Sequence, residues 1–137
     1  MTSADYDLAD NLFIEQIQTN SSTATVALNL TGNNQDQTII GNSGANRLDG
    51  EGGDDLLRGL GGNDVFVFAE NYDNDTINGF QDNVDEIDLT DFNFANVAAA
   101  TSSAIQVGSD VAFNFGGGDT LVVENTTIAA LGNDLIL

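Results

Sequence analysis

The chain has 137 residues and carries 2 Lys and Arg against 22 Asp and Glu, a formal net charge of −20. A charge of this sign repels nucleic-acid phosphates and anionic membrane surfaces, so neither is an expected partner. Cys and His are both absent, which excludes Cys/His zinc sites, disulfides, and thiol or imidazole catalysis.

The N-terminal region, residues 1–31, is expected to form irregular strands beside the repeats that follow it. Residues 1–10 have neither the basic start nor the apolar run of a signal peptide. No stretch of the chain approaches the roughly 18 consecutive apolar residues of a transmembrane helix. The sequence therefore predicts neither membrane insertion nor ordinary N-terminal export.

Residues 32–67 divide into four nonapeptides: GNNQDQTII, GNSGANRLD, GEGGDDLLR and GLGGNDVFV. Each begins with glycine and has an apolar residue at its eighth position, namely Ile39, Leu48, Leu57 and Phe66. A glycine-rich turn of six residues followed by a strand of three predicts a solenoid with two nonapeptides per coil. The four apolar residues should then form one buried column, with turns 18 residues apart stacked at about the 4.8 Å spacing of strands. A flexible linker would not keep this phase.

A carboxylate at the sixth position of a stacked turn predicts a metal ion. Asp55 should lie near its counterpart one coil away, and two carboxylates about 5 Å apart repel by roughly 3 kcal/mol at an effective dielectric of 20. A divalent cation between them reverses this repulsion. Calcium is preferred to magnesium because glycine turns offer many backbone carbonyls in a flexible cage, and soft transition metals lack their ligands here.

The repeats, most closely residues 50–58 and 59–67, resemble the calcium-binding nonapeptides of the RTX (repeats-in-toxin) family. Residues 64–94, with NDTI and DEIDL, are similar to that family's exit segment, and residues 107–137 resemble its C-terminal hairpin and type I secretion signal. The resemblance implies an all-β fold, a right-handed parallel β-roll. It also implies a monomeric, calcium-binding module of a larger protein, secreted by the type I machinery to the extracellular space or cell surface.

The resemblance further implies a set of calcium ligands in the turns. These are Gly41, Ser43, Gly44, Asn46, Gly50, Gly52, Gly53, Asp55, Gly59, Gly61, Gly62, Asp64, Asp73, Asp75 and Asp85. Turn 41–46 is expected to face turn 59–64, turn 50–55 to face Asp73 and Asp75, and Asp64 to face the turn ending at Asp85. About two to four ions are expected.

Four departures from the family pattern bear on particular sites. Asn46 stands at the sixth position of the second repeat, where the family has aspartate. Gln37 stands at the sixth position of the first repeat and Gln35 replaces its fourth-position glycine, so this repeat should bind weakly or not at all. Gly79 stands where the family usually has an acidic residue.

The C-terminal region, residues 91–137, is expected to form antiparallel strands near 104–107, 110–115 and 119–124, separated by glycine-containing turns. These strands would cover the open end of the roll, which spans residues 32–90 and would otherwise expose unpaired backbone.

Other interpretations of the acidic residues are weaker. DNDTING at 73–79 lacks the later ligands of an EF-hand loop, and a glycosidase carboxylate pair would need an aromatic sugar cleft in a chain without Trp. Arg47 and Arg58 are expected to be solvated or paired, and the clustered Phe residues to belong to the core. The predicted function is a non-enzymatic module that folds on binding calcium. The alternatives are an adhesion or carbohydrate-binding module and a halophilic acidic domain.

Overall fold

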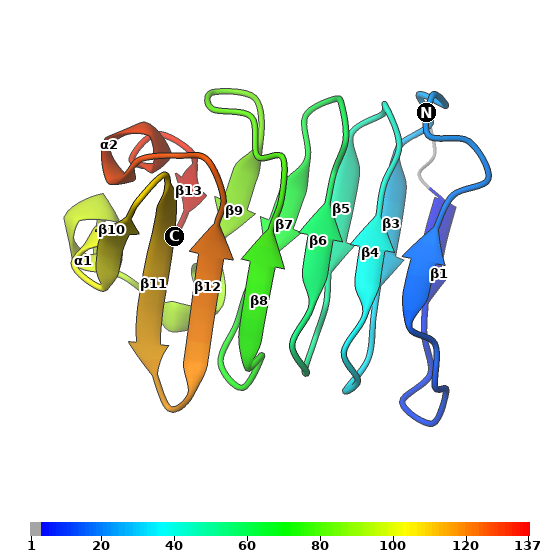
Figure 1. Ribbon diagram of the computed structural model, residues 1–137, viewed down its shortest axis with the longest axis horizontal. Coiled ribbons are helices and arrows are strands. Elements are labelled where there is room, and N and C mark those ends of the chain that lie inside the picture. The colour runs from blue at the N-terminus through cyan, green and yellow to red at the C-terminus, as the bar shows by residue number, and fades with distance from the viewer. Residues whose placement is uncertain (1–3) are drawn as a thin grey trace.

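Figure 1 shows the computed structural model of the chain, of which residues 4–137 are described. The strands form two sheets. In spatial order, sheet A contains β1 (Ala4–Asp7), β3 (Leu28–Thr31), β5 (Asn46–Asp49), β7 (Val65–Val67), β9 (Glu86–Asp88) and β13 (Leu135–Ile136). Sheet B contains β10 (Ala104–Val107), β11 (Asp110–Gly116), β12 (Asp119–Val123), β8 (Asn74–Ile77), β6 (Leu56–Arg58), β4 (Thr38–Ile40) and β2 (Gln16–Gln18).

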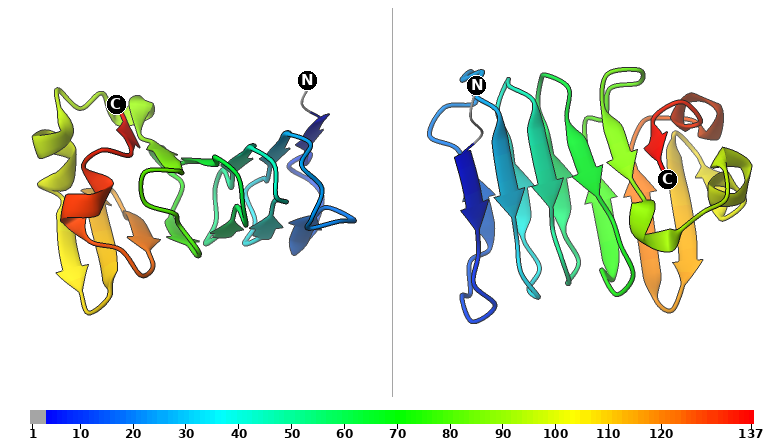
Figure 2. Two further views of the ribbon diagram at one scale, coloured as in Figure 1. Left: turned by 90° about the horizontal axis from the view of Figure 1, so that it is seen from above. Right: turned by 180° about the vertical axis from the view of Figure 1, so that it is seen from behind.

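The chain crosses from one sheet to the other after every strand of the roll. Each strand therefore pairs with the strand two positions earlier in the chain. All strand pairs of sheet A are parallel, and sheet B is parallel from β2 through β8 to β12. Figure 2 shows the two sheets facing each other along the roll. The predicted parallel β-solenoid is confirmed.

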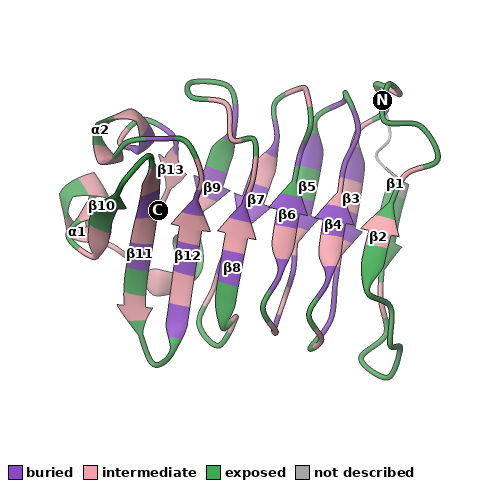
Figure 3. Ribbon diagram, in the orientation of Figure 1, coloured by how far each residue is buried: buried purple, intermediate pink, exposed green. Residues whose placement is uncertain are grey.

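The predicted apolar column forms the centre of the roll. Leu48 pairs with Phe66 in sheet A, Ile39 pairs with Leu57 in sheet B, and all four side chains are at most 1 % exposed. Figure 3 shows buried positions recurring along the roll from strand to strand. Full burial of each such side chain contributes about 1.5–3 kcal/mol, so the column is a main source of cohesion between coils.

The coil length changes along the chain. Hydrogen bonds between stacked turns join residues 18 apart over the repeats, from Gln37 to Asp55 and from Asn46 to Asp64. The next steps, to Asp75 and to Asp85, span 20 and 21 residues. The predicted 18-residue stacking therefore holds within the repeats, and the following coils are longer.

The three predicted C-terminal strands are present as β10, β11 and β12, and they pair antiparallel with one another. The structure adds that β12 pairs parallel with β8 and β13 pairs parallel with β9, so the C-terminal region rejoins both sheets. Three short helices were not predicted: η1 (Thr90–Phe92), α1 (Val97–Thr101) and α2 (Ile128–Leu131). The side chains of Asn96 and Thr127 cap α1 and α2, which is a common way to begin a helix.

The N-terminal strands also belong to the roll. β1 pairs parallel with β3 and β2 with β4, so the strands within residues 4–31 extend both sheets. Residues 1–3 of the predicted N-terminal region lie outside the described residues. The region boundaries at 31/32 and 90/91 stay predictions. Among the helices of residues 4–137, none has the length and apolar character to cross a membrane.

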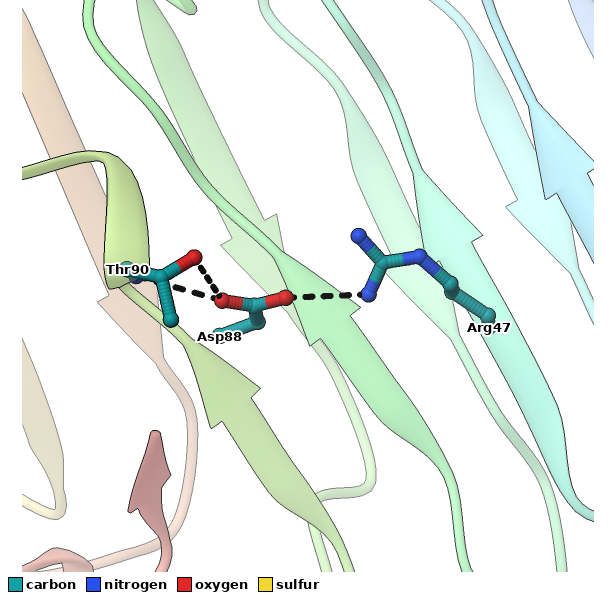
Figure 4. Close-up of polar contacts among 3 residues, drawn as sticks. All are labelled: Arg47, Asp88 and Thr90. Carbon is teal, nitrogen blue, oxygen red and sulfur yellow. Dashed lines mark hydrogen bonds and ion pairs between the residues drawn. The ribbon is translucent and has the colours of Figure 1, made fainter. Parts of the chain in front are cut away.

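One ion pair links three strands of sheet A on its outer face. Arg47 Nη1 on β5 donates to Asp88 Oδ2 on β9 over 3.0 Å, across the intervening β7 (Figure 4). The backbone N–H and the hydroxyl of Thr90 both donate to Asp88 Oδ1. Although burial raises the pKa of Asp88, the hydrogen bonds from Thr90 and Arg47 bring it below its ordinary value. Arg47 is thus paired at the surface, one of the two expected outcomes.

Candidate metal centre

The sixth-position side chains line up in two rows, one at the edge of each sheet. Asn46, Asp64 and Asp85 lie at the start of successive strands of sheet A, β5, β7 and β9, and Gln37, Asp55 and Asp75 lie at the start of β4, β6 and β8 in sheet B. All six are at most 3 % exposed. The turns thus bring together carboxylates that are distant in sequence, as predicted.

A ladder of hydrogen bonds sets the spacing within each row. The backbone N–H of Asp55 donates to Asp75 Oδ1 over 2.9 Å, and the backbone N–H of Asp64 donates to Asp85 Oδ1 over 3.0 Å. The earlier steps repeat this contact, from Gln37 N to Asp55 and from Asn46 N to Asp64. One oxygen of each carboxylate is therefore held by the backbone of the preceding coil.

The second carboxylate oxygen is different. Oδ2 of Asp55, Asp64 and Asp75 is buried and has no hydrogen-bond partner. In two of these turns the Oδ2 atom points toward the first glycine of its own turn. A Cβ placed on Gly50 would collide with Asp55 Oδ2, and one on Gly59 would collide with Asp64 Oδ2. Buried charged oxygens without partners are costly, so these oxygens indicate a cation site.

The backbone of these turns shares an unusual conformation. The second and fourth positions of turns 50–55, 59–64 and 70–75 have positive φ: Glu51 and Gly53, Leu60 and Gly62, Asn71 and Asp73. We call these three the carboxylate turns. A non-glycine residue with φ > 0 costs about 1–3 kcal/mol, and such strain is concentrated at functional sites. In all three turns the sixth-position Oδ2 lacks a partner. The turn ending at Asp85 has positive φ at Asn83 alone of its non-glycine residues, and Asp85 Oδ2 accepts the Gln81 N–H.

Turn 70–75 was not recognised as a repeat from the sequence. Asp73 takes the position that glycine has in the other two carboxylate turns, with φ of 61°, and so the glycine pattern is lost. The remaining signal is Asp75 at the sixth position and the fully buried Ile77 at the eighth. The predicted ligands Asp73 and Asp75 both lie in this turn.

Asp119 completes turn 70–75 from the next coil. It lies at the start of β12, is 8 % exposed, and accepts the backbone N–H groups of Asn71 and Asp73 at 3.1 and 3.2 Å. Asp119 is a site residue that the sequence did not predict, because it comes from a hairpin outside the nine-residue spacing.

The buried carboxyls are electrostatically perturbed. Loss of hydration on burial raises the pKa of Asp55 to about 7, of Asp64 to about 6 and of Asp75 to about 8. Neighbouring acidic groups raise these pKa values further, and backbone N–H donors lower them. Burial also raises the pKa of Asp85, which accepts hydrogen bonds from the backbone N–H groups of both Asp64 and Gln81.

These donors fit calcium. Within residues 4–137 no group of three or more His, Cys, Asp or Glu side chains converges on a metal position, so an ion here would need backbone carbonyls as well as carboxylates. Calcium accepts such mixed oxygen ligands in flexible geometry, whereas magnesium needs a compact octahedron. A cation would give the unpartnered Oδ2 atoms the charge they lack.

The predicted ligands of turn 41–46 are placed differently. The Ser43 hydroxyl donates to the carbonyl of Ser22 at 2.9 Å, and the Gly44 N–H donates to Asn42 Oδ1 at 2.7 Å. Asn46 Nδ2 donates to Asp64 Oδ1 at 2.8 Å across the coils. Turn 41–46 does face turn 59–64, as expected, through contacts to Asp64 Oδ1 and to the carbonyl of Gly59, while Asp64 Oδ2 stays without a partner.

Comparisons with known proteins agree with this geometry. Residues 31–66 match the family model of the RTX calcium-binding nonapeptide repeat, which spans four copies. A search of curated proteins finds no match. Among solved structures, the chain is similar to the extracellular lipase LipA from Serratia marcescens, with a TM-score of 0.71 and 21 % sequence identity.

The likeness to LipA covers 99 % of this chain and 20 % of the lipase, so the chain spans about a fifth of that protein's length. At this level of identity it shows a shared fold. Together with the buried acidic turns and the parallel two-sheet architecture, the matches show that this chain carries RTX calcium-binding nonapeptide repeats folded as a β-roll.

Proposed function

We propose that the chain is a calcium-dependent folding module without a catalytic role, and that it works as part of a larger secreted protein. The observation that carries the proposal is the set of buried, unpartnered Oδ2 atoms of Asp55, Asp64 and Asp75. A metal-free roll must hold these oxygens away from water without compensation, whereas a loaded roll does not.

The ions would be held where carboxylates face each other one coil apart. Asp55 with Asp75, and Asp64 with Asp85, are the two pairs joined by the hydrogen-bond ladder. The carbonyls of glycine turns 50–53 and 59–62, and of the turn that contains Asp73, would supply further oxygen ligands. We expect one ion for each of these two pairs and a third in turn 70–75, which Asp119 closes from the next coil.

Calcium binding would then drive folding, because the sites exist only when two coils are stacked. In a low-calcium cell interior, a chain of net charge −20 would repel itself and stay unfolded. Outside the cell, calcium would neutralise the turns and the apolar column would close. The resemblance of residues 107–137 to a type I secretion signal supports export in the unfolded state.

A larger parent protein is supported by the coverage of the match. The similar lipase is extracellular and about five times as long as the matched region. We propose that this module is likewise one part of an exported protein, with the activity located in another part.

The test is far-UV circular dichroism of the chelated protein, titrated with calcium and, in parallel, with magnesium and sodium chloride. A cooperative coil-to-β transition with calcium alone is the expected result. Folding by sodium chloride at equal ionic strength would favour a halophilic domain instead. A protein fully folded in chelator and indifferent to calcium would contradict the proposal.

A further inference from the structure

The turns at the N-terminal end of the roll differ from the carboxylate turns in sequence and in conformation. Turns 32–37 and 41–46 begin with Gly-Asn and have an amide, Gln37 or Asn46, at the sixth position. None of their residues has positive φ among the described backbone conformations. We call these two the amide turns.

In turn 41–46 an amide nitrogen stands where the carboxylate turns have an oxygen. Asn46 Nδ2 lies near the Cβ position of Gly41, as Asp64 Oδ2 lies near that of Gly59 one coil later. This nitrogen donates to Asn42 O at 3.2 Å, Gly44 O at 2.7 Å, Gly59 O at 3.4 Å and Asp64 Oδ1 at 2.8 Å. Two N–H donors thus serve four oxygens drawn from two coils, the same kind of contacts that a cation would make.

The orientation of this amide is fixed by the same four oxygens. Rotating the amide by 180° would place Asn46 Oδ1 among them and remove all four donor contacts. In the present orientation Asn46 Oδ1 has no partner, but it is a neutral oxygen, and burying it costs less than burying an unpartnered carboxylate.

Turn 32–37 is also closed by an amide, but here the oxygen, Gln37 Oε1, lies near the Cβ position of the first glycine, Gly32. Gln37 Oε1 accepts the backbone N–H of Asn33 at 3.0 Å, and Gln37 Nε2 donates to Asn33 Oδ1 at 2.7 Å. Asn33 Nδ2 in turn donates to the carbonyls of Ala9 and Leu12, both at 3.0 Å. Asn42 makes the equivalent contact from the second amide turn, to the carbonyl of Val26 at 3.0 Å.

We infer that the amide turns are metal-free, and that the Asn33–Gln37 side-chain pair in one turn and the Asn46 side chain in the other do what calcium does in the carboxylate turns. The inference rests on the proposed calcium binding and limits it to the coils from Gly50 onward. The predicted ligands Gly41, Ser43, Gly44 and Asn46 are then structural residues. The roll is a hybrid, closed by amides at its N-terminal end and by ions beyond it.

The test is the substitution N46D, which replaces the donating nitrogen by a carboxylate oxygen in a turn already surrounded by oxygens. The control is N20D, which adds the same charge at an exposed position in a segment, residues 16–35, that has no Asp or Glu. Bound calcium is counted by native mass spectrometry for the wild type and both variants. We expect N46D to bind one ion more than the wild type and N20D to bind the same number. An unchanged count in N46D would overturn the inference.

A second measurement uses the wild type alone, so that poor folding of N46D would not end the test. The Asn46 side-chain NH₂ signals are followed by NMR through a calcium titration. They should become protected from exchange as the protein loads and folds, because the nitrogen gains its four oxygens. Rapid exchange of these signals in the fully loaded protein would show Oδ1 turned to an ion and would refute the inference. A wild type that binds no calcium would instead refute the proposed function.

Discussion

Asp75 holds the backbone of Asp55 with one carboxylate oxygen, at 2.9 Å from the Asp55 nitrogen, while its other oxygen is buried without a partner. One side chain therefore both connects two coils and creates the need for an ion. The two roles can be separated experimentally, because an amide at this position keeps the acceptor oxygen and removes the charge.

Asp75→Asn is expected to have opposite effects with and without calcium. In calcium, loss of one site should lower the free energy of unfolding by about 2.7 kcal/mol when free calcium is 100 times its dissociation constant. In chelator the buried charge opposes folding, so at pH 9 the variant should contain at least as much β structure as the wild type. Urea unfolding in calcium and far-UV circular dichroism in chelator measure the two effects, with exposed Asp10→Asn as the charge-matched control. Less β structure than the wild type in chelator would mean that Asp75 is only structural.

The metal-free protein should be more stable in acid than at neutral pH. The pKa values of Asp64, Asp55 and Asp75 in the fold, about 6, 7 and 8, lie above the ordinary value of 3.8. Groups with raised pKa bind protons more tightly when folded, so their stabilising effect is fully present below about pH 4 and is lost as pH rises through 6 to 8. Circular dichroism of chelated protein from pH 4 to 9 should show this loss. With calcium the trend should reverse, since protons compete with the ion.

Two glycines of one turn should respond differently to the same substitution. A Cβ at Gly59 would collide with Asp64 Oδ2, whereas a Cβ at Gly61 would meet its nearest neighbour, Ser43 Cα, at 3.8 Å. Neither glycine has positive φ. Gly59→Ala should cost about 1–3 kcal/mol and weaken calcium binding, and Gly61→Ala should change stability by no more than about 0.5 kcal/mol. Calcium titrations and thermal unfolding of both variants check this. Equal tolerance of the two would argue against a carboxylate aimed at Gly59.

The Arg47–Asp88 ion pair should make a small, salt-dependent contribution. Because Arg47 is partly exposed, Arg47→Gln is expected to cost no more than about 1 kcal/mol, and the cost should fall at high salt. Arg58→Gln removes the same charge from an exposed side chain and serves as the reference. Urea unfolding at low and high sodium chloride measures the difference between the two variants. A difference that persists undiminished at high salt would indicate packing by the Arg47 stem instead.

Prediction from the sequence succeeded where the signal was periodic. The ninth-residue spacing of Ile39, Leu48, Leu57 and Phe66 was enough to identify the core and the two-sheet coil. Glycine-containing turns likewise identified the bounds of β10, β11 and β12. These are local patterns. Because successive side chains of a strand point to opposite faces, such patterns directly determine which residues face the core.

Prediction failed where the fold depends on contacts between distant segments. The return of β13 to β9 and the capping of turn 70–75 by Asp119 join residues about 50 positions apart, without a shared spacing. The difference between amide and carboxylate turns was visible as Asn46 against Asp64, but its meaning depends on where one nitrogen points. The helices α1 and α2 are too short for a periodic signal.

Because the chain alternates between two sheets, the number of repeats, odd or even, decides in which sheet each later strand lies. Adding a pair of nonapeptides before β12 would insert one whole coil and leave every downstream strand in its own sheet. Adding a single nonapeptide would exchange the sheets for everything that follows, so that the β10–β11–β12 hairpin would arrive at the edge now used by β13. Rolls of this kind can therefore change length only in even numbers of repeats if they are to keep the same C-terminal closure.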